Sequence, residues 1–416
     1  MDDRDFVRLL KSFNANSEVW WDASPTGYAA FKQQLLHRYP TVSGYINELL
    51  PEQFADSPSG VSGATTNPRL VTAAILDESS RWVPRIQALS QTLSTAHVQE
   101  RLYTELISQG ASLLNPLWQQ TLHRQGWLSA QVDANDIHCA ERMVQQGLAL
   151  TKIAPNVMIK VPGSQAGYDA IEQLVAQGCS INNTFCFTVS QFAACLRAIR
   201  LGQAVALHYG TDVSGARYVI TFMIGRFGAE SLLGTQARER GIELTPVDKR
   251  WAEIAIYHAI QALLLRSNSP ARLLISSIKV DRMPGELSRC WHLEKTGERE
   301  TCYTLTPEII EFLVQRESIG CSVQPSASRV PGEVLHKLMK IPYFRDARFE
   351  ESIAARDFAR HPAFICAHAE AVLAHQRLSD FIQGASQAVP MSMPFIGAVS
   401  RPGQTVNQTV LLRASA

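Results

Sequence analysis

The sequence predicts an α/β fold, a (β/α)8 TIM barrel followed by a helical C-terminal extension. Eight short apolar segments with strand character alternate with segments of helical spacing over about the first 300 of the 416 residues. This alternation indicates a parallel sheet with helical crossovers, and eight such units fit a closed barrel. A doubly wound open sheet is the alternative, but no Gly-rich fingerprint follows the first strand. We expect residues 1–320 to form the barrel and residues 321–416 to form the extension and a loosely specified tail.

The predicted strands carry nearly continuous apolar runs, as strands buried on both faces do. Asn67 and Pro68 end the second strand, and Pro68 suits the first turn of the helix that follows. Gly178 ends the helix after the fourth strand, and Pro307 begins the helix after the eighth. Strands are expected at Glu18–Asp22, Gly60–Thr66, Leu128–Asp133, Pro155–Gly163, Ile181–Phe187, Ala216–Ile224, Leu273–Ile278 and Thr301–Thr306. Helices are expected at 3–16, within 25–59 and 69–125, at 135–151, 165–177, 189–202 and 247–267, and from Pro307.

The C-terminal segment differs in pattern from the barrel region. Ser326–Pro342 is loop-like with one short helix, and Phe349–Ile382 is strongly helical with an interruption at Pro362. Gln383–Ala416 is poor in charge and has no clear period. We expect the extension either to lie over the strand ends as a lid or to form the contact of a homodimer.

Composition and charge exclude several classes of partner. Hydrophobic residues make up 46% of the chain and the formal charge is +1, which leaves no electrostatic footprint for nucleic acid or an anionic membrane. No apolar run reaches the length of about 18 residues that a membrane span needs. The eight cysteines include no C-x-x-C pair, and the acidic start lacks the basic region of a signal peptide. We therefore expect a cytoplasmic protein with reduced thiols and without a metal site.

Lys160 lies at the centre of an apolar strand that ends at Pro162 and Gly163. On a period of two, Lys160 and Met158 share one face of the strand, and branched apolar residues take the other. Burial desolvates a lysine ammonium and lowers its pKa, so a neutral amine becomes available near neutral pH. Such an amine forms Schiff bases with carbonyl substrates. For this strand taken alone, the alternative is a strand-end lysine that reaches solvent.

Polar residues recur near the carboxyl ends of the predicted strands, on faces that are otherwise apolar. Active sites of (β/α)8 barrels lie at this end of the strands. Each residue alone has an ordinary structural alternative, such as a satisfied core hydroxyl for Thr184 or a helix N-cap for Asp22. Their recurrence on six strands favours a common site that includes Lys160. The residues are Asp22, Asn67, Ser129, Gln131, Asp133, Asn182, Thr184, Thr221, Ser277 and Lys279, and Met223 shares the face of Thr221.

Several of these motifs resemble those of the transaldolase family, in particular its longer bacterial members. Ala64-Thr-Thr-Asn-Pro68 resembles the family's Thr-Thr-Asn-Pro signature, and Asn156-Val-Met-Ile-Lys-Val-Pro162 resembles its Schiff-base lysine motif. The resemblance follows the family's order over residues 15–318. Further motifs that carry it are Trp20-Trp-Asp22, Ile181-Asn-Asn-Thr-Phe-Cys-Phe187, Thr221-Phe-Met-Ile-Gly-Arg226 and Thr304-Leu-Thr-Pro-Glu308.

The resemblance implies an enzyme that moves a dihydroxyacetone unit from a ketose phosphate to an aldehyde acceptor, with no cofactor. Lys160 would form the imine with the C2 carbonyl, and Asp22 would take the C4 hydroxyl proton as the C3–C4 bond breaks. Thr184 would position a catalytic water. Arg226, with Lys279, would bind the phosphate, as guanidinium geometry favours. The other substrate contacts that it implies are Asn67, Asn182, Thr221 and Ser277.

Gln131 departs from the family pattern, in which a glutamate usually relays protons through the water held by the threonine. An amide orients a water but cannot act as a general acid or base at neutral pH. The related fructose 6-phosphate aldolases resemble this chain in having glutamine there, so simple aldol cleavage or addition is the alternative to transfer. Met223 matches neither type. A specialised pathway stands beside the pentose phosphate route, and a barrel that has lost turnover and acts as a scaffold is the alternative from another class.

Overall fold

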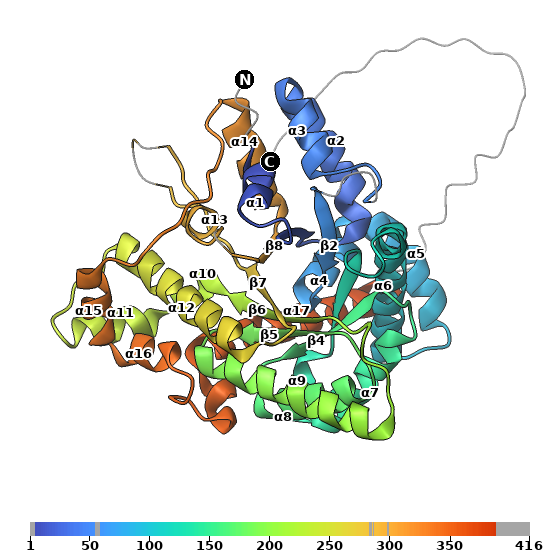
Figure 1. Ribbon diagram of the computed structural model, residues 1–416. Helices are drawn as coiled ribbons and strands as arrows, with labels where there is room; N and C mark the ends of the chain where they lie inside the picture. The colour runs from blue at the N-terminus through green and yellow to red at the C-terminus, as the bar shows by residue number, and fades with distance from the viewer. Residues whose placement is uncertain (1–4, 55–58, 283–284, 286, 298, 388–416) are drawn as a thin grey trace, which may run out of the picture.

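The computed structural model describes residues 5–54, 59–282, 285, 287–297 and 299–387. Its central feature is a closed barrel of eight parallel strands that follow one another around the ring in sequence order (Figure 1). Helices lie between the strands and continue into the C-terminal part, so the predicted (β/α)8 barrel with a helical extension is confirmed. The strands are β1 (Glu18–Trp21), β2 (Val61–Thr65), β3 (Trp127–Gln131), β4 (Val157–Pro162), β5 (Ile181–Cys186), β6 (Tyr218–Met223), β7 (Arg272–Ser276) and β8 (Cys302–Leu305).

The inward faces of the strands fill the lower part of the barrel with apolar side chains. Met158 packs there with Trp20, Leu274 and other buried residues, whereas Ile159 on the opposite face of β4 belongs to the main hydrophobic core. Gly63 on β2 leaves room for the indole of Trp20, because a Cβ atom there would lie 2.7 Å from that ring. Lys160 follows Met158 by two residues on the same face and therefore stands above this apolar layer.

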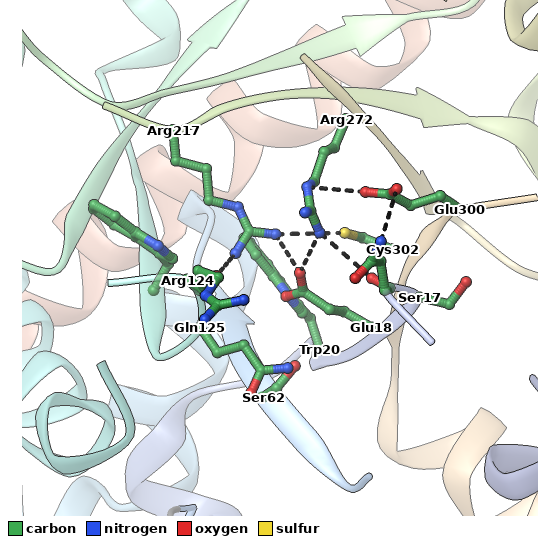
Figure 2. A network of polar contacts seen from close by, with 12 residues as sticks. Ser17, Glu18, Trp20, Ser62, Arg124, Gln125, Arg217, Arg272, Glu300 and Cys302 are labelled. Atoms are coloured by element: carbon green, nitrogen blue, oxygen red, sulfur yellow. Dashed lines mark hydrogen bonds and ion pairs between the residues drawn. The ribbon is translucent and has the colours of Figure 1, made fainter. Parts of the chain in front are cut away.

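Charged residues close the amino-terminal end of the barrel (Figure 2). The buried Glu18 carboxylate binds Arg217 at 2.5 Å and Arg272 at 3.0 Å, and it accepts the indole N–H of Trp20 at 2.9 Å. Burial alone would raise the pKa of Glu18, but the two guanidinium charges outweigh it and hold that pKa below its ordinary value. Residues at this end of a barrel contribute to stability, which leaves the opposite end for chemistry.

The helices of the barrel region begin and end largely where the sequence signals lie. Asn67 caps α4 and Pro68 is its first residue, as predicted. The helix expected at 189–202 continues as α9 to Tyr209, and Gly210 ends it with a left-handed φ of 72°. The helix expected at 135–151 begins only at Ala140. The helices are α1 (Phe6–Phe13), α2 (Tyr28–Arg38), α3 (Ser43–Leu49), α4 (Pro68–Asp77), α5 (Ser79–Ser90), α6 (Thr95–Gln120), α7 (Ala140–Thr151), α8 (Gln165–Ala176), α9 (Val189–Tyr209), α10 (Ile224–Phe227), α11 (Ser231–Arg238), α12 (Pro246–Ser267), α13 (Trp291–Lys295) and α14 (Pro307–Ser318), with 3-10 turns η1 (Pro25–Gly27), η2 (Pro40–Val42) and η3 (Ala134–Asp136).

The first helices of the C-terminal extension share the main hydrophobic core of the barrel, whereas α17 packs in two separate apolar clusters. Leu338 and Phe344 lie in the core cluster that the barrel helices share, so the division at residue 320 stays a prediction. The predicted interruption at Pro362 is confirmed, because His361 is extended between η4 and α17 and Pro362 begins α17, where its missing N–H leaves no hydrogen bond unmade. The expected helix is wrong for residues 349–353, which form turns and bends. Residues 383–387 belong to this helix, and residues 388–416 lie outside the described part of the chain. The elements are α15 (Gly332–Met339), α16 (Pro342–Arg348), η4 (Ala355–Arg360) and α17 (Pro362–Gln387).

The extension runs from the outside of the barrel to its mouth. The helices α15 and α16 contact α12, while α17 contacts α4, α5, α6 and β5 (Figure 1). Within the described residues, no helix is both long and apolar enough to cross a membrane.

Candidate active site

One cavity at the carboxyl ends of the strands receives side chains from the whole ring. It has a volume of about 70 Å³. Ala367, Glu370 and Ala371 of α17 line its mouth. The predicted site residues that line it are Asp22, Asn67, Gln131, Lys160, Thr184, Thr221, Arg226 and Ser277, and the remaining strands contribute Thr65, Ser276 and Thr304.

Lys160 lies in this cavity between the third and fifth strands, since its register partners are Gln131 on β3 and Asn182 on β5. The side chain is buried, and no hydrogen bond or ion pair joins its Nζ to another of the described residues. Burial lowers the pKa of Lys160, and the nearby charge of Asp22 opposes that shift in part. The position therefore favours a neutral amine that faces an open space.

Hydroxyl groups hold Asp22 at the edge of the cavity. The Thr65 hydroxyl donates to Asp22 Oδ1 at 2.6 Å and lies 3.0 Å from the Thr304 hydroxyl, so three strands converge on this carboxylate. The N-cap alternative for Asp22 does not hold, because the following 3-10 turn has Ser24 at its N-cap position. Asn67 does act as a cap, accepting the Leu70 N–H at 3.0 Å while it lines the cavity.

Asn182 lies below the cavity rather than in its lining. It is fully buried, its amide nitrogen donates to the Ser129 hydroxyl at 2.9 Å, and its oxygen accepts from the Thr221 hydroxyl at 2.7 Å. These bonds form a polar layer across β3, β5 and β6 that supports the Lys160 strand. Its role as a substrate contact stays a prediction.

Gln131 faces the cavity with an unsatisfied donor. The Gln131 Nε2 atom is buried and has no hydrogen-bond partner among the described residues, although the backbone carbonyl accepts from the Tyr103 hydroxyl at 2.8 Å. Thr184, also buried, lines the same cavity. A water or substrate hydroxyl between these two side chains would satisfy the amide, because buried donors normally find partners.

Two cavity residues have unusual backbone conformations. Phe185, at a bulge in β5, has φ 56°, and Ser277, just after β7, has φ 58°. Non-glycine residues with positive φ store strain that persists at functional sites when the surroundings hold it. Both conformations turn the chain as it leaves a strand at the cavity.

A cluster of charges lies at the mouth of the cavity. Arg226 forms a bidentate pair with Glu370 of α17, with distances of 2.8 Å and 2.5 Å. The pKa of Glu370 is lowered chiefly by the Arg226 hydrogen bond, and the charges of Arg69 and Lys279 lower it further. Arg69 lines the cavity, whereas Lys279 is exposed and stands outside the lining.

A buried pair connects the two segments that carry Arg226 and Lys279. The Glu253 carboxylate accepts the Gly228 N–H at 3.0 Å and lies 2.8 Å from His292 Nε2. The Nδ1 atom of His292 accepts the Lys279 N–H at 3.1 Å, so its Nε2 carries the proton toward Glu253. The pair fixes the chain after β6 against the chain after β7.

Sequence reasoning missed several residues of the cavity. Thr304 and Ser276 lie on the inward faces of predicted strands, so the period of two contained a signal for them. Arg69 directly follows the Thr-Thr-Asn-Pro motif and lies outside it, so no motif indicated it. Glu370 had no local signal, because only the tertiary path of α17 brings it to the mouth.

The sequence also matches a known protein family. Residues 49–356 match the profile of the Transaldolase/Fructose-6-phosphate aldolase family. The chain belongs to this family. The match extends beyond residue 320, so the family's sequence pattern includes the first part of the extension. The resemblance inferred from the strand motifs is thereby confirmed at the level of the family.

Individual members of the transaldolase/fructose-6-phosphate aldolase family match only part of the chain. The proteins named Transaldolase from Mycobacterium ulcerans and Mycobacterium tuberculosis are each 30% identical over 191 residues, which is 45% of this chain and 49% of the relative. Transaldolase 1 of Streptomyces avermitilis is 29% identical over 198 residues, or 47% and 50%. The chain thus spans about half the length of the curated relatives it matches. Among the described residues, no group of three or more His, Cys, Asp or Glu side chains has the arrangement of a metal site.

Proposed function

We propose that the protein is a Schiff-base enzyme that moves a dihydroxyacetone unit from a ketose phosphate to an aldehyde acceptor. Lys160 carries this proposal, since it is a buried lysine with a lowered pKa that faces a polar cavity at the carboxyl ends of the barrel strands. Family membership supports the reaction class.

The proposed reaction uses the cavity side chains in sequence. The Lys160 amine adds to the C2 carbonyl and loses water, which leaves a protonated imine. Asp22 takes the C4 hydroxyl proton, the C3–C4 bond breaks, and its electron pair passes into the imine to give an enamine. The aldehyde fragment leaves, and the enamine adds to the carbonyl carbon of an acceptor aldehyde. Water then hydrolyses the new imine and frees Lys160.

A second candidate is aldol cleavage or addition without transfer, and Gln131 favours it. Transfer requires the enamine to survive until an acceptor arrives, while free dihydroxyacetone forms once it is protonated and hydrolysed. The Gln131 amide can hold a water beside Thr184 but cannot itself exchange protons at neutral pH. The balance between the two outcomes therefore depends on which group supplies protons at this position.

Product analysis tests the proposal and separates the two candidates. Incubated with fructose 6-phosphate and erythrose 4-phosphate, the protein is expected to form sedoheptulose 7-phosphate and glyceraldehyde 3-phosphate, and Lys160→Met to form neither. Free dihydroxyacetone in place of sedoheptulose 7-phosphate would identify the aldol reaction. Failure to form any product from these sugars or from other ketose phosphates would support the scaffold alternative.

A further inference from the structure

The helix α17 is built into the mouth of the cavity rather than laid loosely over it. His368 Nε2 lies 2.8 Å from the Ala134 carbonyl, and the Thr72 hydroxyl donates to the Ala374 carbonyl at 2.9 Å. The Phe364 ring packs edge-on against Phe185, with 5.4 Å between ring centroids. These contacts tie α17 to η3, α4 and β5, which are all at the carboxyl ends of the strands. The helix therefore holds Glu370 at a defined place.

The Glu370 carboxylate lies at the mouth of the cavity, where it pairs with Arg226. Its two oxygens lie on the two terminal nitrogens of Arg226, which is the parallel geometry that guanidinium also offers to two oxygens of a phosphate. Arg69 and Lys279 lie close enough for their charges to act on the same carboxylate. One guanidinium thus pairs with Glu370, two further cations act on the same carboxylate from nearby, and this anion belongs to the protein itself.

The charge of Glu370 adds a second argument. A phosphate on Arg226 would lie against the Glu370 carboxylate, and like charges at such distances repel. The two anions therefore cannot both form the bidentate pair with Arg226 that Glu370 forms here.

We propose that Glu370 is a specificity-determining residue that competes with the substrate phosphate for Arg226. The proposal rests on the proposed function, because it concerns the phosphate end of the same site. A phosphorylated ketose binds by displacing Glu370 from Arg226, and the displacement weakens the affinity for phosphate relative to a site without this carboxylate. Donors that lack a phosphate leave the Arg226–Glu370 pair intact.

Calorimetric titration with inorganic phosphate tests the competition without turnover. Glu370→Gln keeps the shape of the side chain and removes its charge, so we expect its Kd for inorganic phosphate to fall about three- to ten-fold. Glu370→Asp keeps the charge on a shorter side chain, so its Kd for inorganic phosphate should lie between those of the unaltered protein and Glu370→Gln. Adding Arg226→Gln to either protein should abolish the binding. The matched control is Glu350→Gln, which removes the carboxylate from the surface pair with Arg266 and should leave the Kd unchanged.

The opposite results overturn the proposal. If Glu370→Gln binds phosphate as weakly as the unaltered protein or more weakly, Glu370 is not a competitor. The same conclusion follows if neither protein binds phosphate, or if Glu350→Gln strengthens binding equally. Reductive trapping of a ketose on Lys160 tests the proposed imine chemistry independently of the phosphate titration. A protein that binds phosphate as expected but traps no ketose would refute the proposed function while leaving the competition intact.

Discussion

Lys160 unites two properties that seldom occur together in a lysine. It is buried, and its ammonium has no carboxylate or hydroxyl within hydrogen-bonding distance among the described residues. The desolvation that lowers its pKa outweighs the attraction of Asp22. Each pKa unit corresponds to about 1.4 kcal/mol between the two protonation states, so this environment makes the neutral, nucleophilic amine more accessible.

Under the proposed function, Gln131 is the residue at which transfer and aldol chemistry would diverge. Gln131→Glu would place a group capable of proton exchange in the cavity that Thr184 also lines. We expect it to raise the rate of sedoheptulose 7-phosphate formation from fructose 6-phosphate and erythrose 4-phosphate at least about tenfold, as general acid–base catalysis does. Gln173→Glu, on the exposed face of α8, is the control for added charge. An unchanged rate in Gln131→Glu would mean that another group relays the proton.

The sequence predicted which strand faces point into the barrel better than it predicted the level of each side chain along the barrel axis. Asp22 and Thr184 reach the cavity from the carboxyl ends of their strands, and Lys160, which pairs in register with Asn182, reaches it with its long side chain. Asn182 has the same inward direction, but it precedes Thr184 by two residues, and a strand rises about 3.3 Å per residue. It therefore lies in the layer beneath, where its amide is occupied by Ser129 and Thr221. A period of two gives the face of a strand and not the level.

The junction between η4 and α17 has a pH-sensitive residue of its own. His361 is buried, both of its ring nitrogens lack partners among the described residues, and it stacks on Phe187 with 5.8 Å between ring centroids. Desolvation lowers the pKa of His361 from 6.5 to about 4. The unfolded chain thus binds a proton in this range that the folded chain does not. The contribution of the neutral His361 ring to the free energy of unfolding is fully present above pH 6.5 and is lost as the pH falls through the folded pKa.

His361→Phe is expected to remove this loss, because phenylalanine fills the same aromatic stack without a titrating group. The free energy of unfolding decreases between pH 7 and pH 4, and this decrease should be about 3 kcal/mol smaller in the variant than in the unaltered protein. Urea unfolding at both pH values measures the difference. His208→Gln, on the exposed end of α9, controls for the loss of a histidine. Equal pH dependence in all three proteins would contradict the assignment to His361.

Local signals specify the starts of two helices. Asn67 and Pro68 specify the start of α4 through a cap and a compatible first residue. Pro362 marks the predicted break in the same way, because it begins α17 after a 3-10 turn, where its missing N–H costs no hydrogen bond. The sequence predicted helix at residues 349–353 as well, but these residues form turns and bends.

The two ends of the barrel have different physical roles. The amino-terminal end is closed by Glu18 with two arginines over an apolar layer, while the carboxyl end holds Lys160 in a polar cavity beneath α17. The barrel could be predicted because alternating strands and helices leave few topologies. The route of the extension could not, since residues such as Glu370 reach the mouth through contacts with elements far away in the sequence.

The proposed imine on Lys160 can be observed directly by borohydride reduction with fructose 6-phosphate, followed by intact mass measurement. Lys32 provides a matched control, since it is also buried but lies on α2 and outside the cavity. We predict a mass increase equal to a reduced ketose phosphate or its three-carbon unit in the unaltered protein and in Lys32→Met, and none in Lys160→Met. An equal adduct in Lys160→Met, or no adduct in any of the three proteins with fructose 6-phosphate or dihydroxyacetone, would contradict a Schiff base at Lys160.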